Sequence, residues 1–139
     1  MGKRVTINVE SSQDDGSEQE EITTQSNGDL YQKNGTYYLK YEETAEGLEG
    51  VKTTVKIKEQ EVTLIRQGQV RTMQSFVPDT KTDFDYKTPY GTLNLTLEVE
   101  EFNLNVNETD GEIQLEYAVY SEEGLVSNNQ LAIKYCEEE

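Results

Sequence analysis

Apolar and polar residues alternate with a period of two along most of this chain. The clearest runs are Val5 to Val9, Val51 to Ile57, Leu93 to Val99, Ile113 to Val119 and Leu131 to Tyr135. A β-strand places successive side chains on opposite faces of its sheet, so each run has one apolar face and one wet face. Half-buried strands of this kind are typical of antiparallel sheets. The alternation therefore predicts an all-β protein.

Turn signals separate these runs. The pairs Asn27-Gly28, Asn34-Gly35 and Asp110-Gly111 are of the type that supplies the positive φ angles of tight hairpins. The runs between turn signals correspond to about 8–10 short strands. Consecutive hairpins favour up-and-down order, and an apolar content of only 33% suits a barrel with a single interior. We therefore predict one closed antiparallel barrel over residues 1–139, with a two-layer sandwich as the alternative.

Two segments interrupt the regular pattern. Residues 11–21, SSQDDGSEQEE, are too polar to pack against a core, and we predict that they form a mobile acidic loop. Near Glu100-Glu101 the apolar residues change from odd to even numbers. This change predicts either a β-bulge within one long strand or the end of one strand and the start of the next.

The charge of the chain restricts its partners. The formal net charge is −16 at pH 7, which opposes binding to nucleic acid and to anionic membranes. The single cysteine, Cys136, cannot form an internal disulfide, and no apolar run reaches the length of a signal peptide or a membrane span. We therefore expect a cytoplasmic protein, monomeric or homodimeric, that binds neither nucleic acid nor membrane.

The absence of histidine removes several kinds of active site. Catalytic triads, Cys-His dyads, and zinc or haem sites with histidine ligands are all excluded. Cys136 is followed by three glutamates, which disfavour the thiolate and make it a poor nucleophile. We therefore expect a protein without enzymatic activity, cofactor or metal site. An enzyme that uses carboxylates or tyrosines alone is the alternative.

Several short motifs occur in a characteristic order. They are GDLY at 28–31, YYLKYEE at 37–43, VKTTVK at 51–56, Arg66-x-Gly68-x-Val70, Gln74-x-Phe76 and TPYG at 88–91. Together they resemble the YwiB-like family of Gram-positive bacteria, a family of unknown function. The resemblance implies a calycin-like barrel, similar in architecture to lipocalins and fatty-acid-binding proteins. It implies no reaction, because the family has no established one.

A local cationic segment stands out in this acidic chain. Residues 51–76 hold five lysines and arginines and two glutamates, a net charge of +3. The lysines fall on the polar parity of their strand and should lie outside. Arg66 instead shares a face with Val62 and Leu64, and an inward Arg66 would lie beside Gln74 of the next strand. Because fatty-acid-binding barrels pair an interior arginine with the ligand carboxylate, the resemblance makes Arg66 the first site candidate. The alternatives are an internal ion pair and an exposed side chain.

Tyrosine is unusually frequent, with nine residues and no tryptophan. Inward tyrosines either bring hydroxyl groups into a cavity or fill the core. The sequence therefore favours non-catalytic binding of a small, partly apolar, anionic ligand in the barrel. A protein-interaction or regulatory module with a packed barrel and no ligand is the alternative. The candidate ligand-binding residues are Arg66, Gln74, Tyr37, Tyr41, Tyr86, Tyr90 and Tyr117.

Overall fold

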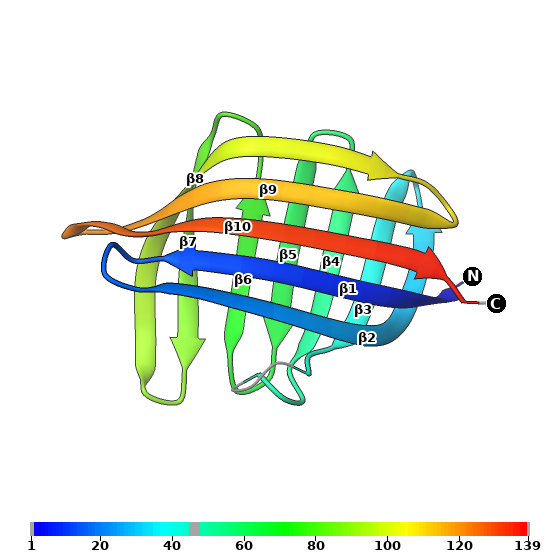
Figure 1. The fold of residues 1–139 in the computed structure, drawn as a ribbon, viewed down its shortest axis with the longest axis horizontal. Helices are drawn as coiled ribbons and strands as arrows, with labels where there is room; N and C mark the ends of the chain where they lie inside the picture. Colours follow the sequence, from blue (N-terminus) through cyan, green and yellow to red (C-terminus); the bar gives the residue numbers. More distant parts are fainter. Residues whose placement is uncertain (1, 45–47, 139) are drawn as a thin grey trace.

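A computed structural model describes residues 2–44 and 48–138, and these residues contain ten β-strands. The strands are β1 (Lys3–Asp14), β2 (Gln19–Lys33), β3 (Thr36–Glu42), β4 (Lys52–Lys58), β5 (Glu61–Gln67), β6 (Arg71–Phe76), β7 (Lys81–Thr88), β8 (Gly91–Val106), β9 (Asp110–Ser121) and β10 (Gly124–Glu137). Each strand pairs antiparallel with its sequence neighbours, and β1 also pairs with β10, so the sheet closes (Figure 1). The predicted closed barrel with up-and-down order is confirmed. The described residues include no helix long and apolar enough to cross a membrane.

The barrel is flattened into two layers whose strands cross. The long strands β1, β9 and β10 run across the shorter strands β3 to β7 in Figure 1. The strands β2 and β8 bend and contribute to both layers. In β8, the first half pairs with β7 and the second half with β9. The two bent strands therefore form corners where one layer passes into the other.

The corner in β8 contains a β-bulge. Val99 pairs with Tyr117 and Glu101 with Glu116, which leaves Glu100 as an extra residue. The bulge shifts the parity of the strand, so that Phe102, two positions after Glu100, still packs partly buried against the core. Of the two possibilities that the sequence left open, the structure confirms the bulge within one continuous strand.

The acidic segment 11–21 is not a loop, and this prediction is wrong. Residues 11–14 continue β1 and residues 19–21 begin β2, and the two strands pair through this region. The turn between them is stabilised by Asp15, whose carboxylate accepts the backbone N–H groups of Ser17 (3.0 Å) and Glu18 (2.8 Å). Strand pairing uses backbone hydrogen bonds and needs no apolar side chains, so hydropathy did not reveal this hairpin.

Only one of the three predicted glycine turns has the expected conformation. Asn34 and Gly35 have φ angles of 52° and 81° and connect β2 to β3. Gly28 lies inside β2, and Gly111 lies inside β9 against the ring of Tyr135, where a Cβ atom would collide with the aromatic carbons. At Gly28 and Gly111 the glycine permits close packing rather than a turn, so these two predictions are wrong.

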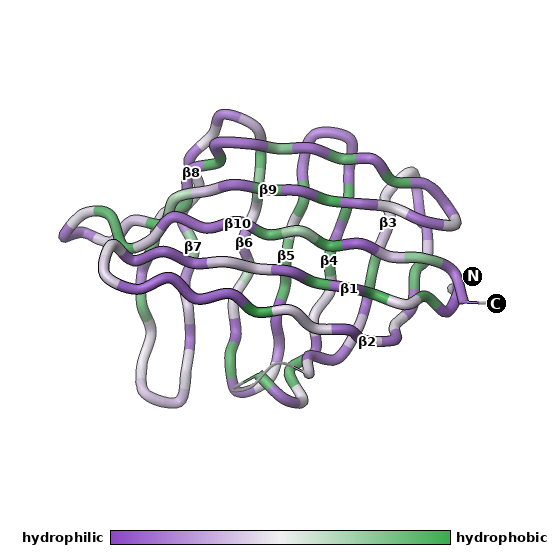
Figure 2. The backbone as a smooth tube through the Cα atoms, viewed as in Figure 1, coloured by the Kyte–Doolittle hydropathy of each residue, from purple (hydrophilic) through white to green (hydrophobic). Residues whose placement is uncertain are grey.

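The interior of the barrel is filled with apolar side chains. At least nineteen buried apolar residues form one cluster that receives side chains from every strand. Figure 2 shows the corresponding alternation of hydrophobic and hydrophilic positions along β9 and β10. The cluster includes fully buried Leu39, Val55 and Phe76 on β3, β4 and β6. Toward one end of β3 to β6, several of the inward side chains are polar.

Candidate functional site

A row of polar side chains crosses the interior at that end of the barrel. It consists of Tyr41, Thr53, Arg66, Thr72 and Tyr86, which are consecutive cross-strand partners on β3 to β7. Tyr41, Thr53 and Thr72 are no more than 6% exposed, and Tyr86 is partly buried. We call these five residues the polar row. Thr53 and Thr72 are the two cross-strand partners of the predicted Arg66 and therefore belong to the same candidate site, although sequence analysis did not select them.

Arg66 points inward and forms an internal ion pair with Glu43. The distance from Arg66 Nε to Glu43 Oε2 is 3.5 Å, and the two side chains are 21% and 5% exposed. Thr53 Oγ1 donates a 2.6 Å hydrogen bond to the same carboxylate oxygen. The carboxylate that an interior arginine needs is therefore supplied by the protein. Sequence analysis missed Glu43, although it has the same parity as Tyr41, two residues earlier on β3.

The ion pair affects the neighbouring phenols. The pKa of the Tyr41 hydroxyl lies far above its ordinary value. Burial is the largest cause of this rise and the negative charge of Glu43 is the next, whereas the charge of Arg66 opposes it. Burial also raises the pKa of Tyr117, again opposed by Arg66. Both hydroxyl groups therefore stay protonated and uncharged at neutral pH.

Five of the seven candidate residues lie near one another. Arg66, Tyr41 and Tyr86 belong to the polar row. Gln74, 8% exposed, occupies the next inward position after Thr72 on β6. Tyr117 packs edge-on against Phe76, with ring centroids 4.8 Å apart, and lies within the electrostatic influence of Arg66.

The other two candidates lie elsewhere. Tyr37 is four residues before Tyr41, about 13 Å along the strand, and lines a separate hollow of about 250 Å³ with Leu30 and Glu108. Tyr90 is fully exposed in the turn between β7 and β8. The prediction that Tyr90 lines or closes the interior is wrong, because the Thr88–Gly91 turn holds it outside the barrel.

The lysines of the cationic segment lie on the outer face, as predicted. Lys52 and Lys58 of β4 are exposed, and Lys56 points outward between them. The Lys56 ammonium lies 5.9 Å from the ring centroid of Tyr38, which stacks on Tyr31. Cation–π contact and stacking anchor these side chains to the surface.

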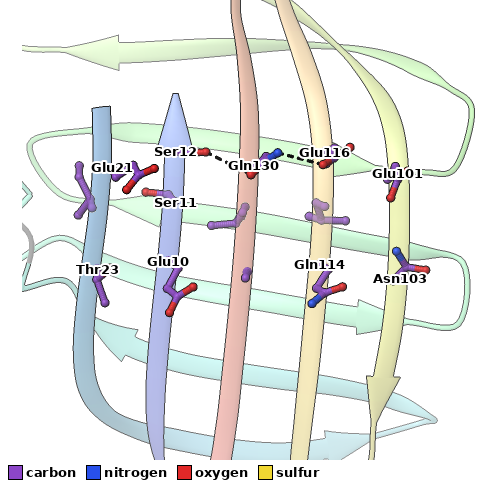
Figure 3. Close-up of a pocket in the computed structure, with 14 residues that line it drawn as sticks. Glu10, Ser11, Ser12, Glu21, Thr23, Glu101, Asn103, Gln114, Glu116 and Gln130 are labelled. Atoms are coloured by element: carbon purple, nitrogen blue, oxygen red, sulfur yellow. Dashed lines mark hydrogen bonds between the residues drawn. The ribbon is translucent and has the colours of Figure 1, made fainter. Parts of the chain in front are cut away.

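A hollow of about 400 Å³ lies on the outer face of the opposite layer. Figure 3 shows its floor, which two rows of outward side chains cover across β2, β1, β10, β9 and β8. The registers place the rows in the order Thr23, Glu10, Ala132, Gln114, Asn103 and Glu21, Ser12, Gln130, Glu116, Glu101. We call these ten residues the outer hollow.

The outer hollow is acidic and contains no basic side chain. Glu10 and Glu21 lie on one side of β10, Glu101 and Glu116 on the other, and β10 between them contributes neutral residues. Gln130 Nε2 donates a 3.0 Å hydrogen bond to Glu116 Oε1 (Figure 3). Glu101 and Glu116 are direct cross-strand partners. Like charges in that arrangement destabilise a sheet, so fold stability does not explain them.

Comparison with known proteins identifies relatives of the whole barrel. Residues 7–133 match the family described as Domain of unknown function (DUF1934). The chain is 34% identical over 116 residues to the uncharacterized β-barrel protein YwiB of Bacillus subtilis (strain 168), covering 84% of this chain and 81% of that protein. It is also similar to the crystal structure of the ywiB protein from Bacillus subtilis, with a TM-score of 0.87 and 30% identity over 99% of this chain and 94% of that one. The closed ten-strand barrel, its sequence and its relatives together show that the chain belongs to the DUF1934 family.

Proposed function

We propose that this protein is a non-catalytic binding module that docks a lysine- or arginine-rich segment of another protein in the outer hollow. The observation that carries the proposal is a hollow of about 400 Å³ on the outside of a packed barrel, which the described residues line with four carboxylates and no cation. A hollow of this size is within the range of ordinary binding sites.

The charge of the whole chain supports a cationic partner. A net charge of −16 attracts basic molecules over a distance, and the acidic floor continues that attraction at contact. The corresponding face of a second copy has the same charge and is repelled. A partner of opposite charge is therefore favoured over face-to-face self-association.

The dimensions of the hollow favour an extended segment over a small cation. Five strands span about 19 Å, because neighbouring strands are about 4.8 Å apart. An extended chain covers that distance in about six residues. Two cationic side chains on such a segment can reach the two glutamate pairs on either side of β10.

Fluorescence anisotropy of a fluorescein-labelled octalysine peptide tests this proposal. The peptide is titrated with the full chain at low ionic strength. The double substitution Glu10→Gln/Glu101→Gln should weaken binding about fivefold, since each exposed ion pair contributes about 0.5 kcal/mol. The control Glu122→Gln/Glu123→Gln changes the net charge equally in the exposed β9–β10 turn and should alter affinity less than about twofold.

Equal weakening in both variants would show only a diffuse charge effect and refute the proposal. Spermine binding as tightly as the peptide would also refute it, in favour of a small-cation site.

A second candidate function is binding of a small molecule inside the barrel, which the sequence favoured. One observation supports it: the buried polar row contains hydrogen-bond donors that have no partner within residues 2–44 and 48–138. The structure gives less support to an anionic ligand, because Glu43 already neutralises the charge of Arg66. A native mass spectrum of protein purified from its own host tests this function, and a retained non-covalent mass is the expected result.

A further inference from the structure

Two buried hydrogen-bond donors in the polar row have no partner among the described residues. They are Arg66 Nε and Thr72 Oγ1, and Thr72 is only 5% exposed. Arg66 Nε lies 3.5 Å from Glu43, which is close enough for charge attraction, but its N–H forms no hydrogen bond. Buried polar groups in folded proteins are almost always hydrogen-bonded, so two neighbouring exceptions need an explanation.

The two donors face the same part of the interior. Arg66 and Thr72 are direct cross-strand partners on β5 and β6, and both occupy inward positions. Partners of this kind have Cβ atoms about 5 Å apart. A single oxygen acceptor placed between them can therefore accept hydrogen bonds from both donors.

The charges around this part of the interior select an uncharged guest. Arg66 and Glu43 compensate each other, so an anion is repelled by Glu43 and a cation by Arg66. Tyr41 and Thr53 add hydroxyl groups to the same row. Behind the row, Val55 and Leu64 are no more than 2% exposed and fill the interior. A guest at this row is therefore limited to a molecule, or the end of one, with few heavy atoms.

We propose that the polar row binds a small uncharged molecule through an oxygen acceptor, such as an amide carbonyl, that accepts hydrogen bonds from Arg66 and Thr72. This proposal rests on the second candidate function and is independent of the outer hollow. It also gives Glu43 a role, because the carboxylate holds the guanidinium in place and excludes anionic guests.

Acetamide is the probe, with acetate and methylammonium as charged analogues of similar size. Titration of the ¹⁵N-labelled full chain should give saturable shifts of the Arg66 and Thr72 backbone amides with acetamide only. Thr72→Val keeps the shape of the side chain and removes the hydroxyl group. It should weaken acetamide binding about fivefold, as expected for one lost hydrogen bond.

The thermal stability of the variants supplies a second readout. Without a probe, Thr72→Val should keep or raise the Tm, because it removes a buried hydroxyl group that has no partner. The matched control is Thr63→Val, on the outer face of β5, which should change neither acetamide binding nor the Tm. A clear loss of Tm in Thr72→Val alone would show that the hydroxyl is bonded within the protein and would overturn the proposal.

Other outcomes separate this proposal from the function on which it rests. Absence of saturable acetamide shifts, or equal binding of acetate, overturns the proposed ligand class. If the native mass spectrum still contains a retained mass in that case, small-molecule binding stands and only the class is wrong. An ordered water between Arg66 and Thr72, together with no acetamide binding and no retained mass, overturns both.

Discussion

Replacing Glu43 by glutamine removes the charge that compensates Arg66 and tests whether the internal pair is desolvated. At 3.5 Å the attraction is about 5 kcal/mol for an effective dielectric constant of about 20. Removing one partner of a buried pair costs about 3–5 kcal/mol. Because Arg66 is 21% exposed and can turn partly toward water, we expect Glu43→Gln to lower the free energy of unfolding by about 2–3 kcal/mol.

Urea denaturation of the wild-type protein and the variant measures this loss, with an unchanged m-value as the sign that the unfolded state is unaffected. Glu42→Gln is the matched control, because Glu42 is the preceding residue on β3 and points outward. It should change stability by less than about 0.5 kcal/mol. The reverse substitution, Arg66→Met, should cost more than Glu43→Gln, because Glu43 is only 5% exposed and less able to reach solvent. A loss below about 0.5 kcal/mol in Glu43→Gln would refute a desolvated pair and leave Arg66 free for an anion.

Three further predictions concern buried contacts. Gly111→Ala should destabilise the protein by about 2–3 kcal/mol in urea, because the new Cβ collides with the Tyr135 ring; an unchanged midpoint would contradict this. Thr53→Val should cost about 1–2 kcal/mol in the same assay, since it leaves Glu43 without its 2.6 Å hydrogen bond, and a neutral result would show that the bond contributes nothing. Burial raises the pKa of Tyr135 to about 12 from an ordinary value of about 10. The folded state therefore holds this proton longer than the unfolded state, so stability is complete below pH ~10 and falls by about 2–3 kcal/mol as the pH approaches ~12. Tyr135→Phe should reduce that alkaline loss, and an identical pH profile in the variant would refute the assignment.

Much of the fold could be predicted from the alternation of side chains, because the period of a strand is fixed by backbone geometry. The alternation placed Val62, Leu64 and Arg66 on one face, and the structure puts that face inside. It also located an irregularity near Glu100, because an extra residue reverses the parity of everything that follows, but it did not distinguish a bulge from the end of a strand. These features depend on local geometry, which the sequence contains directly.

The features that the alternation did not predict depend on backbone pairing or on contacts between residues distant in sequence. The β1–β2 hairpin forms through backbone pairing, so its polar side chains concealed it. Gly28 and Gly111 are required by close packing against distant residues, and this need has no local sequence signal. Glu43 has the same parity as Tyr41, but the sequence of this acidic chain gives no signal that separates it from an exposed acid such as Glu42. The outer hollow depends on the curvature of five strands, and this curvature could not be derived from the alternation.

The bulge at Glu100 also constrains how this strand can vary in length. Deleting Glu100 would restore strict alternation and keep Val99, Phe102 and Leu104 on the inner face, but it would remove the irregularity at which the strand bends. Deleting Asn103 instead would turn Leu104 and Val106 toward water, because each residue after the deletion moves to the opposite face. Because side-chain direction alternates with a period of two, single-residue insertions and deletions within either half of β8 should be excluded, and loss of the bulge residue would remove a bend that the corner uses. We therefore expect natural variation in the length of β8 to accumulate at its ends, away from the corner.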